Sequence, residues 1–432
     1  MKLKIYNLGK VKNAEIDVDG LTVIAGSNNT GKSTVGKVVF SVYNSLNDIE
    51  YKILSHRIAS VGALCRRNVR NALSHRTALG EMSRTISAIA MNLSREITRY
   101  VADGIQKGYS ISYDSVREIF DAFLSQNKIF LDVDEIDELV NAVFSESLEV
   151  LQLSEKIIAQ ALVSRSFART FNDQINALQN GDIAAVNLEL KNRTIAIEFA
   201  DHKCTSLDVG ISILHRAIYI DNPFVLDQLD KESYSAGENA LADLINSEYE
   251  VDDSQIIEAV LAEEKIDEIF HMLSSVVNGR VLVKNGDYFL EDKNCDQPIS
   301  VKNLSSGLKS FVLLKMLVES GLIRNKDVLV LDEPEIHLHP EWQIVYAELI
   351  VLLQKHMNLS IIVTTHSPYF LDAIDLFSKK HKIESRTNYY LSKVVDTQAE
   401  FQKVSNCIDV IYREMASPID VLETLRYELT EE

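Results

Sequence analysis

The feature that most constrains this chain is the glycine-rich segment GSNNTGKS at residues 26–33. It follows the apolar run LTVIA at residues 21–25 and precedes a stretch, from Ser33 to about Leu46, that reads as a helix. A strand, a G-x-x-x-x-G-K-[ST] turn and a helix together form a phosphate-binding loop, in which backbone N–H groups and the helix N-terminus face phosphate oxygens. The segment therefore predicts nucleotide binding within an α/β fold.

The motif predicts a role for each residue of this loop. The Lys32 ammonium is expected to reach the β- and γ-phosphates, and the Ser33 hydroxyl is expected to bind Mg²⁺. The predicted phosphate-binding residues are Gly26, Ser27, Asn28, Asn29, Thr30, Gly31, Lys32, Ser33 and Thr34.

A second segment supplies the acidic residues that such a loop requires. LVLDE at residues 329–333 reads as a buried strand that ends in two carboxylates. Asp332, at the carboxyl end of this strand, is predicted to hold Mg²⁺ through water. Glu333 is predicted to act as the general base that orients the attacking water.

Two further motifs stand in a fixed order around the acidic strand. LSSGLK, at residues 304–309, begins a long helix, and TTHSP, at residues 364–368, follows the apolar strand SIIV. With the first two motifs, this order resembles ABC-type ATPases. In that family, a serine and a glycine bind the γ-phosphate held by the other subunit, and a switch histidine contacts the same phosphate. The resemblance implies nucleotide contacts for Ser305, Ser306 and Gly307 and a catalytic role for His366.

The sequences DEPEIHLHP and THSPYFL resemble one branch of these ATPases, which includes RecF, SMC heads and the OLD-like ATPases of anti-phage defence. The resemblance covers about residues 1–40 and 280–375 and implies ATP and Mg²⁺ as cofactors. It also implies a homodimer or larger homo-oligomer with composite ATP sites. The strongest likeness is to stand-alone ATPase subunits such as those of Septu or retron-linked systems, which act with a separate nuclease or toxin.

The distribution of strand-like and helix-like patterns predicts the domains. We expect an α/β fold: an ABC-ATPase head with a mixed central sheet and an antiparallel β-subdomain, plus a large helical insertion. VNLELKNRTIAIEF, at residues 186–199, and GRVLVKNGDYFLED, at residues 279–292, read as hairpins. The expected boundaries are 1–44 with 279–432 for the head, 45–180 for the helical insertion, 181–222 for antiparallel strands of the head, and 223–278 for an acidic helical segment.

Three features depart from the resembled branch. No long coiled coil is indicated, and the four cysteines are scattered, which disfavours a zinc hook and favours reduced thiols. Only 66 residues follow His366, so we expect no Toprim nuclease in this chain. No glutamine-bearing loop that would sense Mg²⁺ is identifiable, and Gln228 is only a weak candidate.

Charge leaves a second function open. The net charge of −19 argues against a dedicated DNA clamp, but residues 52–107 carry ten Lys/Arg against three acidic residues. This stretch either pairs with the acidic residues that follow it or contacts DNA or RNA, as in a RecF- or SMC-like ATPase of DNA repair. An insertion of about 270 residues between Ser33 and Leu304 disfavours a transporter's nucleotide-binding domain. No apolar run or signal peptide indicates a membrane, and we expect a cytoplasmic protein.

The segment after the acidic strand is ambiguous by itself. Glu335, His337 and His339 have a spacing that suits a metal site. Their place beside Glu333 instead matches the loop that crosses to the opposite subunit in ABC-type ATPases. On that interpretation the histidines face the dimer seam and hold no metal, and Pro340 begins the next helix.

Overall fold

The computed structural model describes residues 1–74, 81–127, 129, 131–177, 183–229, 236–246, 267–284 and 287–431. The chain divides into two compact units, residues 1–47 with 160–432, here called the head, and residues 48–159, here called the helical unit. Sequence patterns placed the insertion at 45–180, whereas the second half of α6 (Glu155–Phe171) belongs to the head. Phe167 of this helix is fully buried, with its ring centroid 4.6 Å from that of Phe199.

An eleven-stranded mixed sheet forms the head, in the order β6-β5-β4-β1-β2-β14-β13-β3-β12-β11-β7. Strands β3, β12, β11 and β7 pair in parallel, whereas β1, β2, β4, β5 and β6 form antiparallel pairs. This arrangement confirms the predicted α/β class and mixed sheet. The bounds are β1 Lys2–Leu8, β2 Val11–Asp17, β3 Leu21–Ala25, β4 Ala184–Leu190, β5 Arg193–Ala200, β6 Lys203–Val209, β7 Ala217–Ile220, β11 Val328–Asp332, β12 Ser360–Thr365, β13 Thr387–Val395 and β14 Gln398–Lys403.

Helices cover both faces of the parallel part of the sheet. Leu329 and Leu331 of β11 belong to a core cluster with α9, α10 and α11, whereas Val330 faces α1 on the other side. Alternation along a strand sends neighbouring side chains to opposite faces, so a strand covered on both faces is apolar throughout. Besides the second half of α6 and a helix at 267–276, the described helices of the head are α1 (Lys32–Leu46), α7 (Ala236–Asn246), α9 (Ser306–Glu319), α10 (Pro340–Met357), α11 (Pro368–Lys380) and α12 (Asp409–Glu431).

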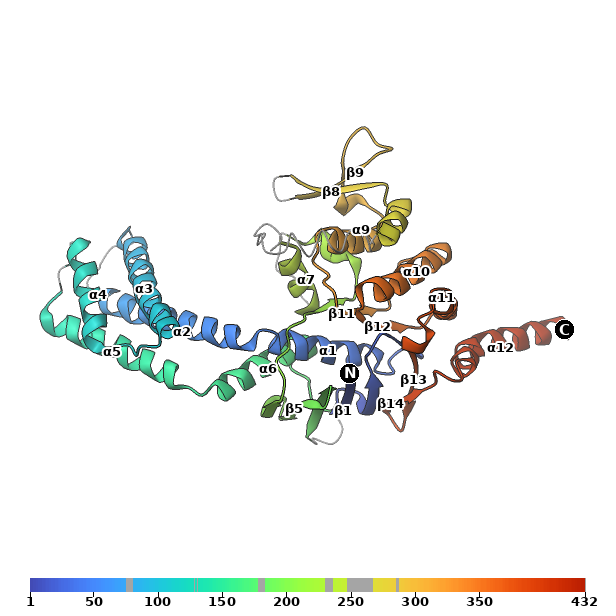
Figure 1. The fold of residues 1–432 in the computed structure, drawn as a ribbon, viewed down its shortest axis with the longest axis horizontal. Helices are drawn as coiled ribbons and strands as arrows, with labels where there is room; N and C mark the ends of the chain where they lie inside the picture. Colours follow the sequence, from blue (N-terminus) through green and yellow to red (C-terminus); the bar gives the residue numbers. More distant parts are fainter. Residues whose placement is uncertain are drawn as a thin grey trace. The chain divides into compact units, whose positions relative to one another are not determined.

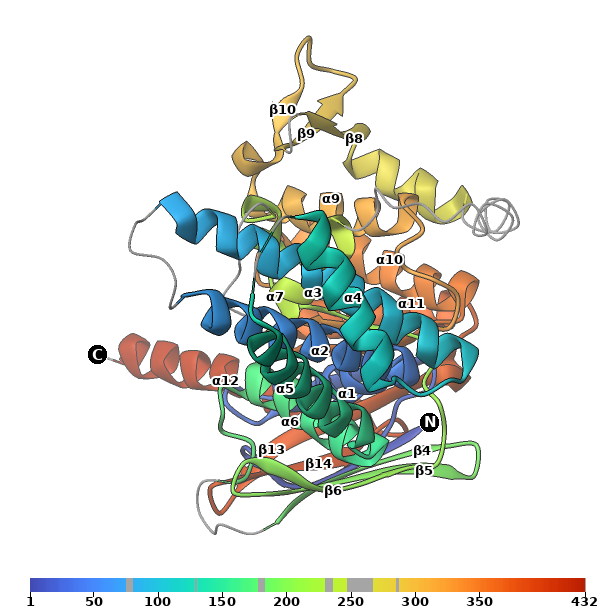
Figure 2. The ribbon, with the colours of Figure 1, turned by 90° about the vertical axis from the view of Figure 1, so that its left-hand side faces the viewer.

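Two hairpins predicted from the sequence are present in the head. The 186–199 hairpin is confirmed as β4 and β5, which lie beside β6 in Figure 2. The 279–292 hairpin is confirmed as β8 (Gly279–Lys284) and β9 (Asp287–Asp292), which form a three-stranded sheet with β10 (Ile299–Ser300). Its turn residues, Asn285 and Gly286, lie outside the described residues.

The acidic segment expected to be helical at 223–278 is described only in part. It contains the 3₁₀ helix η1 (Pro223–Asp227), α7, and a helix at 267–276. Residues 230–235 and 247–266 lie outside the described residues.

The helical unit contains α2 (Ile49–Ser74), α3 (Glu81–Lys107), α4 (Tyr113–Gln126) and α5 (Val133–Gln152) around a core of its own. Arg67 of α2 lies 2.9 Å from Glu146 of α5, so part of the basic stretch pairs with the acidic one. Arg70, Arg95 and Arg99 are exposed. Within the described part of the chain, no helix is long and apolar enough to cross a membrane.

Candidate functional site

The phosphate-binding loop joins β3 to α1 in a backbone shape that needs glycine at two positions. Gly31 has φ +77° and is the N-cap of α1, a left-handed conformation that L side chains rarely adopt. A Cβ on Gly26 would lie 2.4 Å from the Ser392 hydroxyl of β13 and 2.5 Å from its carbonyl oxygen. Ser33 and Thr34 lie in the first turn of α1, directly after this loop.

Lys32 is buried at the base of the loop, with its side chain only 3% exposed. Its ammonium donates to the carbonyl oxygens of Gly26 at 3.0 Å and Ser27 at 2.8 Å. The same nitrogen lies 3.5 Å from Glu333 Oε1. A buried ammonium is costly without such partners, and these contacts hold the charge between the loop and the acidic end of β11.

Ser392 braces the loop from the neighbouring strand. Its hydroxyl lies 2.6 Å from the Thr30 hydroxyl and donates to Ala25 O at 3.3 Å, while Thr30 donates to Ser27 O at 2.9 Å. Sequence reasoning missed this residue. Its one signal was a small polar residue inside the strand YYLSKVV, and its partners lie more than 360 residues away.

Asp332 ends β11 with its carboxylate held by hydroxyls from both neighbouring strands. Tyr219 of β7 donates to Asp332 Oδ2 at 2.7 Å, and Thr364 of β12 donates to Oδ1 at 2.5 Å. Burial raises the pKa of Tyr219 well above its usual value, and the Asp332 carboxylate raises it further, so the phenol remains a donor. Sequence reasoning found Asp332 but missed Tyr219.

Glu333 follows in a strained left-handed conformation, with φ +50°. Its N–H is held by Thr364, through the carbonyl oxygen at 3.1 Å and the hydroxyl at 3.0 Å. The turn places the Glu333 carboxylate 3.5 Å from the Lys32 ammonium and 3.6 Å from His366 Nδ1. The structure thus brings together three residues that sequence motifs had singled out separately.

The residues suggested for a metal ion are oxygen donors. The Ser33 hydroxyl and the Asp332 carboxylate are hard ligands of the kind that Mg²⁺ prefers, and Mg²⁺ takes only one or two protein ligands beside substrate phosphates and water. They therefore fit Mg²⁺ bound together with a nucleotide. Within the described residues, no group of three or more His, Cys, Asp or Glu side chains forms a metal cluster.

The Glu335, His337 and His339 side chains diverge, which contradicts the metal interpretation of their spacing. Glu335 is 2% exposed and accepts from the Thr365 hydroxyl at 2.5 Å. The His337 ring packs edge-on against Phe224, with centroids 5.2 Å apart. The His339 side chain is 71% exposed. No single ion can contact all three.

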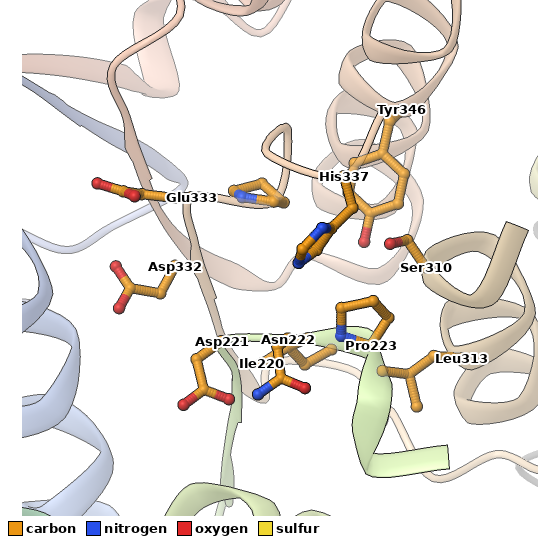
Figure 3. Close-up of a pocket in the computed structure, with 11 residues that line it drawn as sticks. Ile220, Asp221, Asn222, Pro223, Ser310, Leu313, Asp332, Glu333, His337 and Tyr346 are labelled. Atoms are coloured by element: carbon orange, nitrogen blue, oxygen red, sulfur yellow. The ribbon is translucent and has the colours of Figure 1, made fainter. Parts of the chain in front are cut away.

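A small cavity of about 20 Å³, enough for one water molecule, lies beside the acidic ends of β7 and β11 (Figure 3). In Figure 3, the carboxylates of Asp221 and Asp332 lie on the same side as α1, and the His337 ring points toward Asn222 and Pro223. Asp221 and Asn222 were missed by sequence reasoning. Gln228, the weak candidate for a sensing glutamine, does not line this cavity. The lining residues are Ile220, Asp221, Asn222, Pro223, Ser310, Leu313, Asp332, Glu333, Pro334, His337 and Tyr346.

The serine–glycine segment at 305–307 is built into the start of α9. The Ser305 hydroxyl accepts from Leu308 N at 3.3 Å and caps the helix. Gly307 packs closely under the next loop, since a Cβ there would lie 3.0 Å from His337 O and 3.1 Å from the Trp342 ring. This segment lies against the loop after β11 and against α10.

A family model described as "AAA domain, putative AbiEii toxin, Type IV TA system" matches residues 21–372. Among solved structures, an SMC head bound to the C-terminal winged-helix domain of ScpA is 12% identical, with a TM-score of 0.46, and the alignment covers 95% of this chain and 98% of that one. The SMC head domain from Thermotoga maritima is 12% identical, with a TM-score of 0.36, and the alignment covers 93% of this chain and 98% of that one. A third structure is an SMC head domain from Pyrococcus furiosus with an extended coiled coil, bound to the C-terminal domain of ScpA. It is 11% identical, with a TM-score of 0.39, and the alignment covers 98% of each chain.

We predict that Tyr219→Phe destabilises the head by about 1.5–3 kcal/mol, because it removes a hydrogen bond to a partly buried carboxylate. Tyr43→Phe is the matched control, because the buried Tyr43 hydroxyl donates to the neutral sulfur of Met1 and not to a carboxylate among the described residues. Urea denaturation followed by circular dichroism measures both. Equal stability losses in the two variants would show that the Asp332 bond contributes nothing specific.

Proposed function

The chain belongs to the family whose model is described as "AAA domain, putative AbiEii toxin, Type IV TA system", and on this basis we propose that it binds and hydrolyses ATP. The observation that carries the proposal is that the Glu333 carboxylate lies 3.5 Å from the Lys32 ammonium and 3.6 Å from His366 Nδ1. A cation, a general base and a histidine are the groups that phosphoryl transfer to water requires.

Each group has a distinct role in this proposal. The N–H groups of residues 26–34 hold the phosphates, and Lys32 balances negative charge on the β- and γ-phosphates. Glu333 accepts a hydrogen bond from the attacking water and orients it, and the His366 ring lies beside Glu333, next to the γ-phosphate. Ser33 and Asp332 would hold Mg²⁺, which neutralises charge that develops on the phosphates.

We further propose that a complete ATP site requires two copies of this chain. The supporting observation is that Ser305–Gly307, which the family resemblance assigns to the γ-phosphate of the other subunit, form the N-terminus of α9 and lie against the loop after β11. A helix N-terminus suits an anion such as a γ-phosphate. ATP bound between two heads would then join them, and hydrolysis through Glu333 would release them.

The assembled state would regulate a separate effector protein, such as a nuclease or toxin, in anti-phage defence. Support comes from the family description, which names a toxin–antitoxin system. The helical unit, which has its own core, offers a surface through which a partner would sense the assembly state.

We predict that Lys32→Ala abolishes ATP binding, because it removes the buried cation at the base of the loop. Lys37→Ala, on the same helix and outside the motif, is the control. Isothermal titration with a non-hydrolysable ATP analogue measures affinity, and circular dichroism checks folding. Wild-type affinity in a folded Lys32→Ala protein would contradict the proposed site.

We predict that Glu333→Gln retains ATP binding, loses hydrolysis and accumulates an ATP-bound dimer or larger assembly. Glu341→Gln is the control, since Glu341 is 86% exposed in the first turn of α10. Gel filtration with light scattering, with and without ATP, measures assembly size. If ATP does not change the elution volume of Glu333→Gln, the proposal that two copies form one ATP site is wrong.

The second candidate function is direct DNA binding, favoured by the exposed Arg70, Arg95 and Arg99 of the helical unit. It predicts that replacing all three with alanine weakens DNA binding and reduces its salt dependence, because phosphate contacts release counterions. Fluorescence anisotropy over a series of salt concentrations measures both effects. If the wild-type protein does not bind DNA and DNA does not accelerate its ATP hydrolysis, direct DNA binding is excluded as a function.

A further inference from the structure

Glu335 joins the turn after β11 to the end of β12 through one carboxylate oxygen. Oε1 accepts from the Thr365 hydroxyl at 2.5 Å and from the His366 backbone N–H at 3.0 Å. The residue is 2% exposed, and burying a carboxylate at this depth costs stability unless hydrogen bonds compensate. These two bonds fix where the backbone of His366 leaves the sheet.

The same oxygen also faces the His366 ring. His366 Nδ1 lies 3.7 Å from Glu335 Oε1 and 3.6 Å from Glu333 Oε2. Two carboxylates beside one ring nitrogen favour placing an N–H at Nδ1. Glu335 therefore bears on both the position and the tautomer of His366.

A polar network holds Glu335 in this place. Gln343 of α10 donates to the backbone oxygens of Glu335 at 3.4 Å and Leu338 at 3.2 Å, and accepts from the Ser367 hydroxyl at 3.0 Å. The Ser367 N–H in turn donates to the Thr365 hydroxyl at 3.1 Å. The contacts close a ring that joins β11, β12 and α10.

The second oxygen of Glu335 points to a role beyond this brace. Oε2 is buried and has no hydrogen-bond partner within the described residues. A glutamine could make the same two bonds through its carbonyl oxygen without a buried charge, so a purely structural brace does not need a carboxylate. The charge itself is what the His366 ring would respond to.

We propose that Glu335 is a positioning residue that sets the tautomer and place of the His366 ring beside Glu333. It acts through His366 and does not touch the nucleotide. The inference rests on the proposed ATP hydrolysis for its effect on rate, whereas its effect on the His366 ring is independent of that function.

The deciding variant is Glu335→Gln, which preserves side-chain shape and an acceptor oxygen while it removes the charge. The expected result is a fall in kcat of roughly ten- to a hundredfold, as for other outer partners that orient a functional histidine, with ATP affinity unchanged. In protein labelled with ¹⁵N-histidine, the His366 ring signals shift away from the Nδ1–H form. His366→Gln assigns those signals.

Asp327→Asn is the matched control for neutralising a buried acid. Asp327 is also 2% exposed, precedes the same strand β11, and accepts from the backbone N–H groups of Arg216 and Arg324. It lies at the opposite end of β11 from Glu333. We expect this variant to lose stability and to leave kcat and the His366 ring signals unchanged.

Two outcomes would overturn the proposal: His366 ring signals unchanged in Glu335→Gln, or the same shifts in Asp327→Asn. If the wild-type protein does not hydrolyse ATP, the proposed function fails while the ring signals still decide the role of Glu335. If Glu335→Gln does not fold, Thr365→Val replaces it, because loss of the hydroxyl removes one of the two hydrogen bonds that hold Oε1 beside the His366 ring. Unchanged His366 signals in that variant would equally overturn the proposal.

Discussion

Parallel pairing of β12 with both β3 and β11 is the constraint on which the rest of the site depends. Thr364 is aligned with Asp332 on one side and with Ile24 on the other, and Thr365 is aligned with Ala25. Because these strands are parallel, their carboxyl ends meet at one edge of the sheet. A shift of one residue in either pairing would turn the Asp332 carboxylate to the other face.

Charged groups are concentrated at this edge, and short polar side chains at the strand ends stabilise them. The Thr364 hydroxyl donates to the Asp332 carboxylate and accepts from the Glu333 backbone N–H. The Thr365 hydroxyl donates to Glu335, and the Tyr219 hydroxyl donates to Asp332. Each donor comes from a strand next to the acid that it serves. Such satisfied contacts allow the strained Glu333 backbone to persist, because the surrounding bonds determine its conformation.

Sequence reasoning succeeded where a motif acts through its own backbone. The loop at 26–33, the strand ending in Asp332 and Glu333, and the two hairpins depend on residues within a few positions of one another, so their patterns are readable. The same reasoning did not identify Tyr219 or Ser392 as part of the site, since a buried tyrosine or serine in an apolar strand carries no local signal. The pattern of Glu335 with two histidines is ambiguous by itself for the opposite reason, because similar spacing serves metal sites.

The amino-acid sequence by itself determined the family-like motifs, their order, and the α/β class, because turns, strand ends and helix starts are specified by local residue chemistry. Only the tertiary structure decided which side chains complete the site. Ser392 lies against Thr30, Tyr219 against Asp332, and Glu335 against His366. These contacts join residues separated by 31 to 362 positions, and sheet order and register, which no local pattern encodes, bring them together.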